Sequence, residues 1–186
     1  MKLGPALVRI AGSIRFQIVE SARPYMEQLS GETGETVDLS VLDQDKLVFL
    51  DQVPGSHRLR TVSAVGVSFP LHCSANGKAL LAALDDVQFE RMKRHMVLDS
   101  HTANTITSWK KLKDELAKVR KEGIAYDREE HSTGISAVAA VVRGPAGELA
   151  AISITTPTQR FNGLESRLKS RLRDCCSDLQ QVLGHS

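Results

Sequence analysis

The sequence predicts an α+β fold in which helices pack against an antiparallel sheet. Two pairs of strand-like segments, at 35–53 and 134–156, are each joined by a short turn, which is typical of β-hairpins. Around them lie segments whose apolar residues recur every three or four positions, as in amphipathic helices. The order along the chain is helices, strands, helices, strands and a last helix, which we interpret as one domain.

Composition narrows the functional classes. The 186 residues suffice for one large core or two small ones, and 41% hydrophobic with 25% charged residues is ordinary for a soluble globular protein. A net charge of +2 does not favour nucleic-acid binding by this chain. No apolar run is long enough to span a membrane and no secretion signal is visible, so we expect a cytoplasmic protein without a membrane partner. The odd number of cysteines (Cys73, Cys175 and Cys176) indicates free thiols.

The first segment, Leu3–Ser30, has the apolar period of a helix. Pro24 is expected to divide it into a long helix and a short one, and Gly31 is expected to end the second. The face predicted to be buried consists of Leu7, Ile10, Ala11, Ile14, Ile18, Ala22, Met26 and Leu29.

The following segments alternate between apolar and polar residues, as strands do. One side of Glu35–Asp43 is formed by Val37, Leu39 and Val41. A turn at Gln44 and Asp45 leads into a second strand, Lys46–Val53, and the two should form an antiparallel hairpin. Arg58–Ser63 is predicted to be a third strand.

The stretch Gly66–Leu84 changes from extended to helical halfway along. Pro70 pushes the residue before it out of helical geometry, whereas the residues after Cys73 favour a helix. Ser74 is a suitable N-cap for that helix. Lys78 lies one turn into the helix, and we expect it to point outward, away from any site.

The first turn of this helix has small side chains, at Ala75, Asn76 and Gly77. Two interpretations are open. The small residues leave backbone N–H groups free at the positive end of the helix dipole, where a carboxylate or phosphate binds well. Alternatively, they only allow the helix to pack closely on its neighbours.

Two further helices follow. Asp85 and Gln88 form a capping-box pattern for a helix that reaches about Met96. After a polar loop at 97–107, Trp109–Glu122 is strongly amphipathic and ends at a glycine.

Ile124–Asp127 is predicted to be a short extended segment, and a charged connection follows it. The second hairpin consists of Gly134–Val142, a turn at 143–147 and Glu148–Thr156. The two sides of its last strand differ, with Ile152 and Ile154 on one and Ala151, Ser153 and Thr155 on the other. The second side is interpreted either as the wall of a ligand pocket or as a surface facing solvent.

The last helix is predicted to begin at Asn162, which has Glu165 at the position of a capping box, and to end at Gly184. Its apolar stripe consists of Leu164, Leu168, Leu172, Cys175, Leu179 and Val182.

Signatures of catalysis are weak. The Gly-Lys pair at 77–78 does not complete a phosphate-binding loop, and no zinc motif of known spacing occurs. Cys73 near a helix start is a conceivable nucleophile, but neighbouring residues in an extended stretch point oppositely, so His72 is not expected to act as its base. A metal set of His72 with Asp127, Glu129, Glu130 and His131 is a further alternative; a charged connection explains the same acidic residues.

Four segments carry a resemblance to a known family: GETVDLSVLDQDKLVFLDQVPG at 34–55, VGVSFPLHCSANGKALLA at 65–82, the run at 105–142 and AAISITTPTQR at 150–160. Together they resemble the effector-binding domain of the IclR family of bacterial transcription regulators. The resemblance implies a GAF-like fold, with a curved antiparallel sheet flanked by helices. It divides the chain into a linker with N-terminal helices at 1–30 and the effector-binding domain at 31–186. It also implies that the winged helix-turn-helix preceding this domain in the family is missing here.

The resemblance further implies a sensor of small metabolites, often organic or aromatic acids, without a cofactor or metal. The implied pocket residues are Thr61, Ala75, Asn76, Asp127, Ala137, Ser153 and Thr155. This chain has Ala137 where many members have Cys and Val141 where many have Pro, so specificity does not carry over. The expected partners are a carboxylate effector, further copies of the chain in a homodimer or homotetramer, and DNA only through the missing domain. Two alternatives are a GAF-like enzyme using Cys73 and an oligomerisation module with a vestigial pocket.

Overall fold

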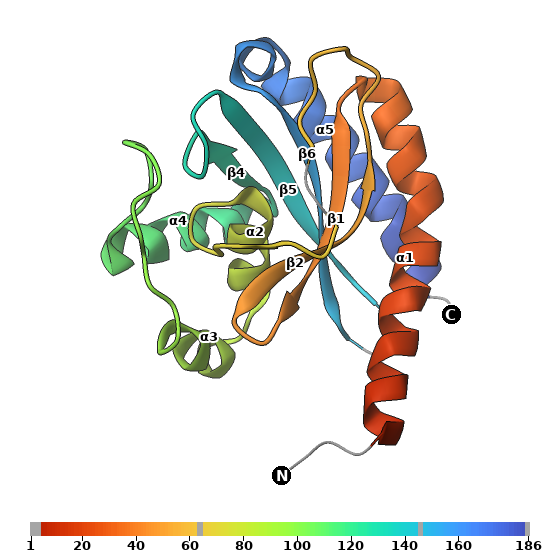
Figure 1. Cartoon of the computed structure of the whole chain (residues 1–186), viewed down its shortest axis with the longest axis vertical. Helices are drawn as coiled ribbons and strands as arrows, with labels where there is room; N and C mark the ends of the chain where they lie inside the picture. Colours follow the sequence, from red (N-terminus) through yellow and green to blue (C-terminus); the bar gives the residue numbers. More distant parts are fainter. Residues whose placement is uncertain (1–4, 63–64, 145–146, 185–186) are drawn as a thin grey trace.

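A six-stranded antiparallel sheet curls between two layers of helices in the computed structural model of the chain (Figure 1). The structure describes residues 5–62, 65–144 and 147–184, with side chains from Phe16 onward. The strands lie in the order β3-β2-β1-β6-β5-β4 and every neighbouring pair is antiparallel. This is the α+β, GAF-like class that the sequence predicts. The strands are β1 Thr36–Asp43, β2 Lys46–Val53, β3 Ser68–Phe69, β4 Ala125–Arg128, β5 Ile135–Arg143 and β6 Leu149–Pro157. The helices are α1 Pro5–Thr33, α2 Ala75–Ala83, α3 Asp86–Lys93, α4 Trp109–Glu122 and α5 Thr158–Gly184.

The sheet is buried on both faces, so the domain has two cores. The long helices α1 and α5 cover one face, which includes Ile152 and Ile154; α2 and α4 cover the other (Figure 1). On β6 the second face carries Ala151 and Ser153, and neither is exposed at all. The interpretation of this side as a solvent-facing surface is therefore wrong. Its small side chains are explained by the close approach of α2, which packs directly on β5 and β6.

The first helix runs without a break from Pro5 to Thr33, so the predicted division at Pro24 is wrong. Pro24 is exposed, and the backbone carbonyl that loses its helical partner can therefore bond to water. The predicted apolar face is buried at Ile18, Ala22, Met26 and Leu29. The side chains of the earlier members of that face lie outside the described residues.

The segment Arg58–Thr61 is not a strand, and Ser63 lies outside the described residues. Side chains, and not the backbone of a neighbouring strand, donate hydrogen bonds to its carbonyl groups. Arg160 donates to Leu59 O at 2.9 Å, and Thr36 Oγ1 donates to Thr61 O at 2.8 Å. The third strand is the two-residue β3, whose Phe69 pairs with Leu47 of β2. The predicted strand is therefore replaced by a loop that is fastened to the sheet.

The last helix begins at Thr158, before the predicted cap at Asn162. The reason is local anchoring. The Thr158 amide donates to Gly134 O at 2.9 Å, and Phe161 is fully buried in the first core. At the far end Leu183 is buried in place of Val182, which is 44% exposed.

Other predicted ends are confirmed by hydrogen bonds and dihedral angles. Asp85 and Gln88 form the expected capping box of α3, which ends at Lys93, short of Met96. Gly123 ends α4 in the left-handed conformation, with φ of 70°. None of the helices in the described ranges is long and apolar enough to cross a membrane.

Candidate functional site

A cavity of about 200 Å³ lies between the start of α2, the sheet and the segment that joins β2 to α2. Six of the seven residues that the sequence singles out line it, namely Thr61, Ala75, Asn76, Asp127, Ala137 and Thr155. Ser153 is not among the lining residues. It is fully buried, and its hydroxyl has no hydrogen-bond partner among the described residues. The structure thus brings together six positions that are scattered over nearly a hundred residues of sequence.

Local geometry explains why α2 starts where it does. The Ser74 hydroxyl accepts the Gly77 amide at 3.2 Å, as predicted for an N-cap. Gly77 is required for close packing, because a Cβ there would lie 2.3 Å from Leu71 O. The packing interpretation of the first turn is therefore confirmed at Gly77, and the anion-binding interpretation stays a prediction. The glycine serves packing, while no side chain in the described residues caps the amides of Ala75 and Asn76.

Polar side chains of the cavity wall are held by the sheet. Asn76 is buried and donates through Nδ2 to Ser40 Oγ of β1 at 2.8 Å. The Thr155 hydroxyl donates to Asp38 Oδ2 at 3.0 Å, and Thr61 Oγ1 donates to Thr155 O at 3.0 Å. Since its proton is used by Asp38, the Thr155 hydroxyl presents lone pairs to a ligand and suits a hydroxyl or N–H better than a carboxylate.

Apolar rings form the rest of the wall. Phe49 and Phe69 both line the cavity, with ring centroids 5.0 Å apart at 85°. His131 stacks on Phe69 at 4.4 Å, and Ile135 adds an aliphatic surface. Two of only five phenylalanines meet here, although they are 20 positions apart in sequence. The sequence pattern did not single them out, because each lies in a strand as an ordinary core residue does.

Lys78 does not point outward, contrary to the prediction. It is fully buried between α2 and its neighbours and forms ion pairs with Glu130 and, at 3.7 Å, with Glu115. Glu130 in turn donates its backbone N–H to Asp127 Oδ1 at 2.7 Å. The Lys78 ammonium group therefore lies behind the cavity wall, where the carboxylates of Glu130 and Glu115 hold it.

Asp127 contributes a carboxyl group to the cavity wall. Burial, as the largest cause, and the neighbouring charge of Glu130 together raise its pKa to about 7, while the Glu130 amide and Lys78 act in the opposite direction. Burial likewise raises the pKa of Glu130 against the effect of Lys78. Near neutral pH the Asp127 carboxyl is therefore partly protonated and can donate a hydrogen bond to an anion.

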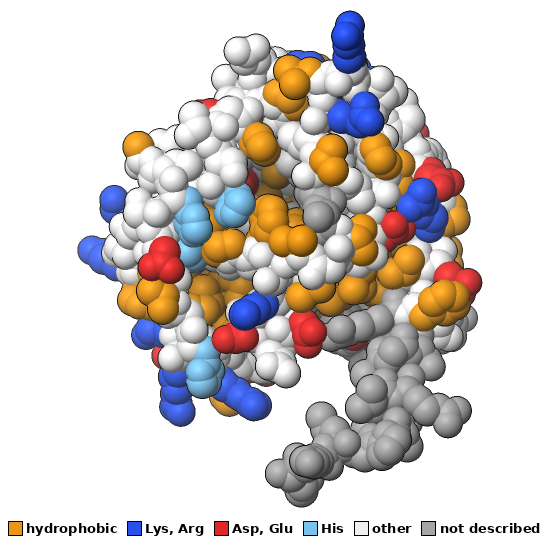
Figure 2. Space-filling view, viewed as in Figure 1, with side chains coloured by type: hydrophobic (Ala, Val, Ile, Leu, Met, Phe, Trp, Pro, Cys, Tyr) orange, Lys and Arg blue, Asp and Glu red, His pale blue; other side chains and the backbone are white. Residues whose placement is uncertain are grey.

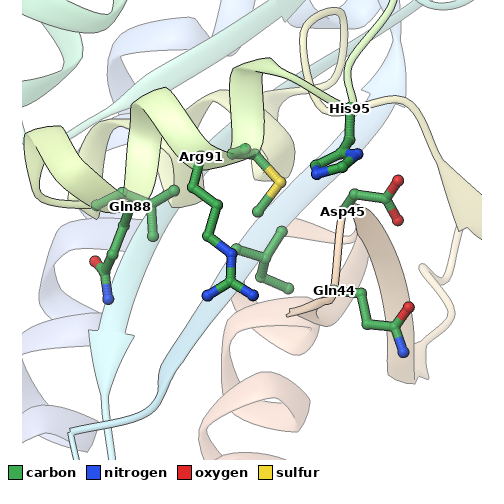
Figure 3. Close-up of a pocket in the computed structure, with 8 residues that line it drawn as sticks. Gln44, Asp45, Gln88, Arg91 and His95 are labelled. Carbon is green, nitrogen blue, oxygen red and sulfur yellow. The ribbon is translucent and has the colours of Figure 1, made fainter.

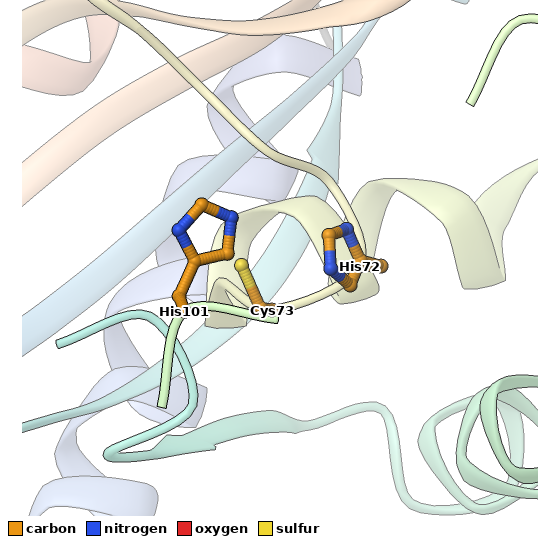
Figure 4. Close-up of side chains that lie close together, drawn as sticks. All are labelled: His72, Cys73 and His101. Atoms are coloured by element: carbon orange, nitrogen blue, oxygen red, sulfur yellow. The ribbon is translucent and has the colours of Figure 1, made fainter. Parts of the chain in front are cut away.

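The alternatives based on Cys73 and on an acidic metal set find little support. Burial raises the pKa of the Cys73 thiol to about 12, so it is a poor nucleophile. The set of His72 with Asp127, Glu129, Glu130 and His131 does not assemble. Among the described residues, the group whose ligand atoms converge is His72, Cys73 and His101 (Figure 4). His72 and Cys73 do not point oppositely, because the chain bends at this point.

A larger hollow of about 620 Å³ lies between the β1–β2 turn and α3. His95 lies beside Asp45, and Arg91 of α3 points into the space between Gln88 and Gln44 (Figure 3). It contains none of the predicted residues. Figure 2 shows that apolar side chains gather around a hollow near the middle of the viewed face, with histidines beside it, whereas most Lys and Arg lie toward the edge.

Comparison with known proteins connects this fold to a family. An HTH-type transcriptional regulator from Mycobacterium tuberculosis is 51% identical over 173 residues, covering 92% of this chain and 66% of that protein. A transcriptional regulator from Rhodococcus sp. RHA1 has a TM-score of 0.86 at 30% identity, covering 98% of this chain and 77% of the other. An IclR homologue from Microbacterium hydrocarbonoxydans, solved with 4-hydroxybenzoate, has a TM-score of 0.82 at 25% identity, covering 100% of this chain and 76% of the other.

The chain spans less than two thirds of the length of the Mycobacterium relative, so it corresponds to part of such a protein. The family described as bacterial transcriptional regulator IclR, C-terminal, matches residues 13–181. That match covers all strands, helices α2 to α4 and most of α1 and α5. The chain therefore belongs to the C-terminal domain family of the IclR bacterial transcriptional regulators.

Proposed function

We propose that this domain binds a small monoanionic carboxylate, aromatic or short aliphatic, in the cavity between α2 and the sheet, and that binding regulates DNA contact by a separate domain. The observation that carries the proposal is that six of the residues implied by the resemblance line one cavity with a polar and an apolar side. Ligand binding would act by favouring one arrangement of subunits over another.

The size of the cavity supports a ligand with a single ring. An apolar cavity of about 150 Å³ can hold benzene. A volume of about 200 Å³ leaves room for one ring with a carboxylate. The solved relative that contains 4-hydroxybenzoate is in keeping with this class of ligand.

The chemistry of the wall supports an orientation. The carboxylate would lie at the uncapped amides of Ala75 and Asn76, where the helix dipole favours a negative charge, and would accept from protonated Asp127. The ring would lie against Phe49 and Phe69. A hydroxyl on the ring would donate to Thr155.

The alternative of a vestigial pocket is not favoured. A vestigial pocket should be filled by bulky side chains, but the wall contains Ala75 and Ala137 and leaves an open volume. The alternative of an enzyme using Cys73 is weakened by the neutral, buried thiol.

A thermal-shift screen tests the proposal. An acid at a hundred times its dissociation constant should stabilise the fold by about 2.7 kcal/mol. For a domain of this size that corresponds to a rise in Tm of roughly 5–11 °C. Benzoate, hydroxybenzoates and short acids should raise Tm, while the matched amides and phenyl phosphate should not. If only amides or phosphates act, the proposed anion contacts are wrong.

Two variants distinguish ligand binding in this cavity from ligand binding in the larger hollow. Ala137→Leu should fill the cavity and abolish the shift, whereas Arg91→Ala in the larger hollow should retain it. The Tm of each variant without ligand shows whether the fold is intact. A shift lost in Arg91→Ala and kept in Ala137→Leu would move the site to the β1–β2 turn.

A further inference from the structure

Two side chains just before α2 have no part in the proposed effector site. His72 and Cys73 are both buried, at 1% and 0% exposure. Together with His101, from the loop between α3 and α4, they point into a common space (Figure 4). The two imidazoles and the thiol offer ligand atoms that all lie within 4.8 Å of one another. Ligands around a tetrahedral zinc ion are about 3.3–3.8 Å apart, given bond lengths of 2.0–2.3 Å, so a small contraction completes the geometry.

A backbone carbonyl fixes the tautomer of His72. Its Nε2 lies 3.0 Å from Asp99 O. A carbonyl oxygen only accepts, so Nε2 carries the proton and Nδ1 is left with a free lone pair. Histidines that bind metals usually donate their other ring N–H to a carbonyl or carboxylate in this way.

The loop that carries His101 is fastened in place although His101 itself is exposed. The His101 amide donates to Thr105 Oγ1 at 3.0 Å. Thr105 Oγ1 donates to Glu130 O, and Thr102 Oγ1 to Glu129 O, both at 2.6 Å. These bonds tie the loop to the connection between β4 and β5, so His101 is held beside the start of α2.

We propose that His72, Cys73 and His101 form a binding site for a zinc-type transition-metal ion. One thiolate and two imidazoles suit Zn²⁺ and disfavour Mg²⁺ and Ca²⁺, which require oxygen ligands. On binding, the Cys73 S–H bond breaks, a metal–Sγ bond forms and the proton passes to solvent. Three protein ligands leave the fourth position to water.

The site adjoins the effector cavity. His131 stacks on His101 with ring centroids 5.4 Å apart, and the same His131 lines the cavity. An ion here would join the start of α2 to the loop at 99–105. It would therefore stiffen one wall of the cavity without contacting its lining residues Ala75 and Asp127.

The test uses Co²⁺ as a spectroscopic probe of the chain after treatment with a chelator. Wild-type protein should bind one Co²⁺ per chain, with visible bands of tetrahedral cobalt and a thiolate-to-cobalt charge-transfer band in the near ultraviolet. Zn²⁺ should displace the signal. Cys73→Ser should lose the charge-transfer band, while Cys175→Ser, which removes another buried thiol, should retain it.

His101→Asn provides a second test of the metal site. It does not disturb the core, because this side chain is exposed. It should weaken Zn²⁺ binding by more than the roughly 10–100-fold typical of losing an outer partner of a metal site. His95→Asn, at the larger hollow, is the matched control and should bind as wild type does. Absence of the charge-transfer band in wild type, or equal Co²⁺ binding by wild type, Cys73→Ser and His101→Asn, would overturn the proposal.

Discussion

The raised pKa of Asp127 leads to a quantitative expectation for ligand binding. If the protonated carboxyl donates to a bound carboxylate, the apparent affinity is proportional to the protonated fraction of Asp127. With a pKa of about 7, that fraction is about 0.9 at pH 6 and about 0.1 at pH 8. The dissociation constant of an aromatic acid should therefore rise about tenfold from pH 6 to pH 8, while the acid itself stays ionised throughout.

The groups around Asp127 define the controls. Glu130 and Lys78 lie behind it, and His131 and Cys73 lie beside it. Burial lowers the pKa of His131, so this imidazole loses its proton below its ordinary range. The Cys73 thiol, with a pKa of about 12, stays neutral.

Isothermal titration calorimetry at pH 6, 7 and 8 measures the effect, with Asp127→Asn as the comparison. The amide keeps a donor but does not titrate, so its affinity should vary less than about twofold over this range. The reasoning would be refuted by a flat wild-type profile, or by a variant that keeps the tenfold dependence.

The same group predicts how stability responds to pH. The folded-state pKa is raised from 3.8 to about 7, so the folded protein binds the proton more tightly and loses stability as pH rises through that window, by about 2–4 kcal/mol. Urea unfolding should show this loss in wild type and not in Asp127→Asn. The buried ion pair predicts that Glu130→Gln costs about 3–5 kcal/mol, because Lys78 is left without its main partner; denaturant midpoints measure it. Gly77→Ala should destabilise by at least about 1–3 kcal/mol through its clash with Leu71, whereas Gly163→Ala, with open space at its Cβ, should be neutral or stabilising; thermal unfolding compares the two. This chain alone should form a dimer or tetramer in light scattering and should not shift DNA selectively in a gel; a monomer or a selective shift would contradict these two expectations.

The sequence determined the local structure wherever short-range patterns decide it. Alternation predicted the hairpins, and cap residues predicted the starts or ends of α2, α3 and α4. These signals are strong because an N-cap or a left-handed glycine acts within one turn of the chain. Predictions from local sequence signals were wrong where burial or exposure in the fold decided the outcome instead. Pro24 stays inside α1 because it faces water, and α5 starts early because Phe161 is buried.

Describing the candidate site required both the sequence and the tertiary structure. Six of its residues could be chosen from the sequence through the resemblance, and small-residue patterns indicated Ala75, Asn76 and Thr155 as well. Their role as ligand contacts stays a prediction. The inward position of Lys78, the aromatic wall of Phe49 and Phe69, and the grouping of His72, Cys73 and His101 depend on contacts between distant segments. Burial among those segments also raises the pKa of Asp127, since desolvation is a property of the surroundings and not of the residue. Only the tertiary structure decides such features, because no local pattern records which helix covers which face of the sheet.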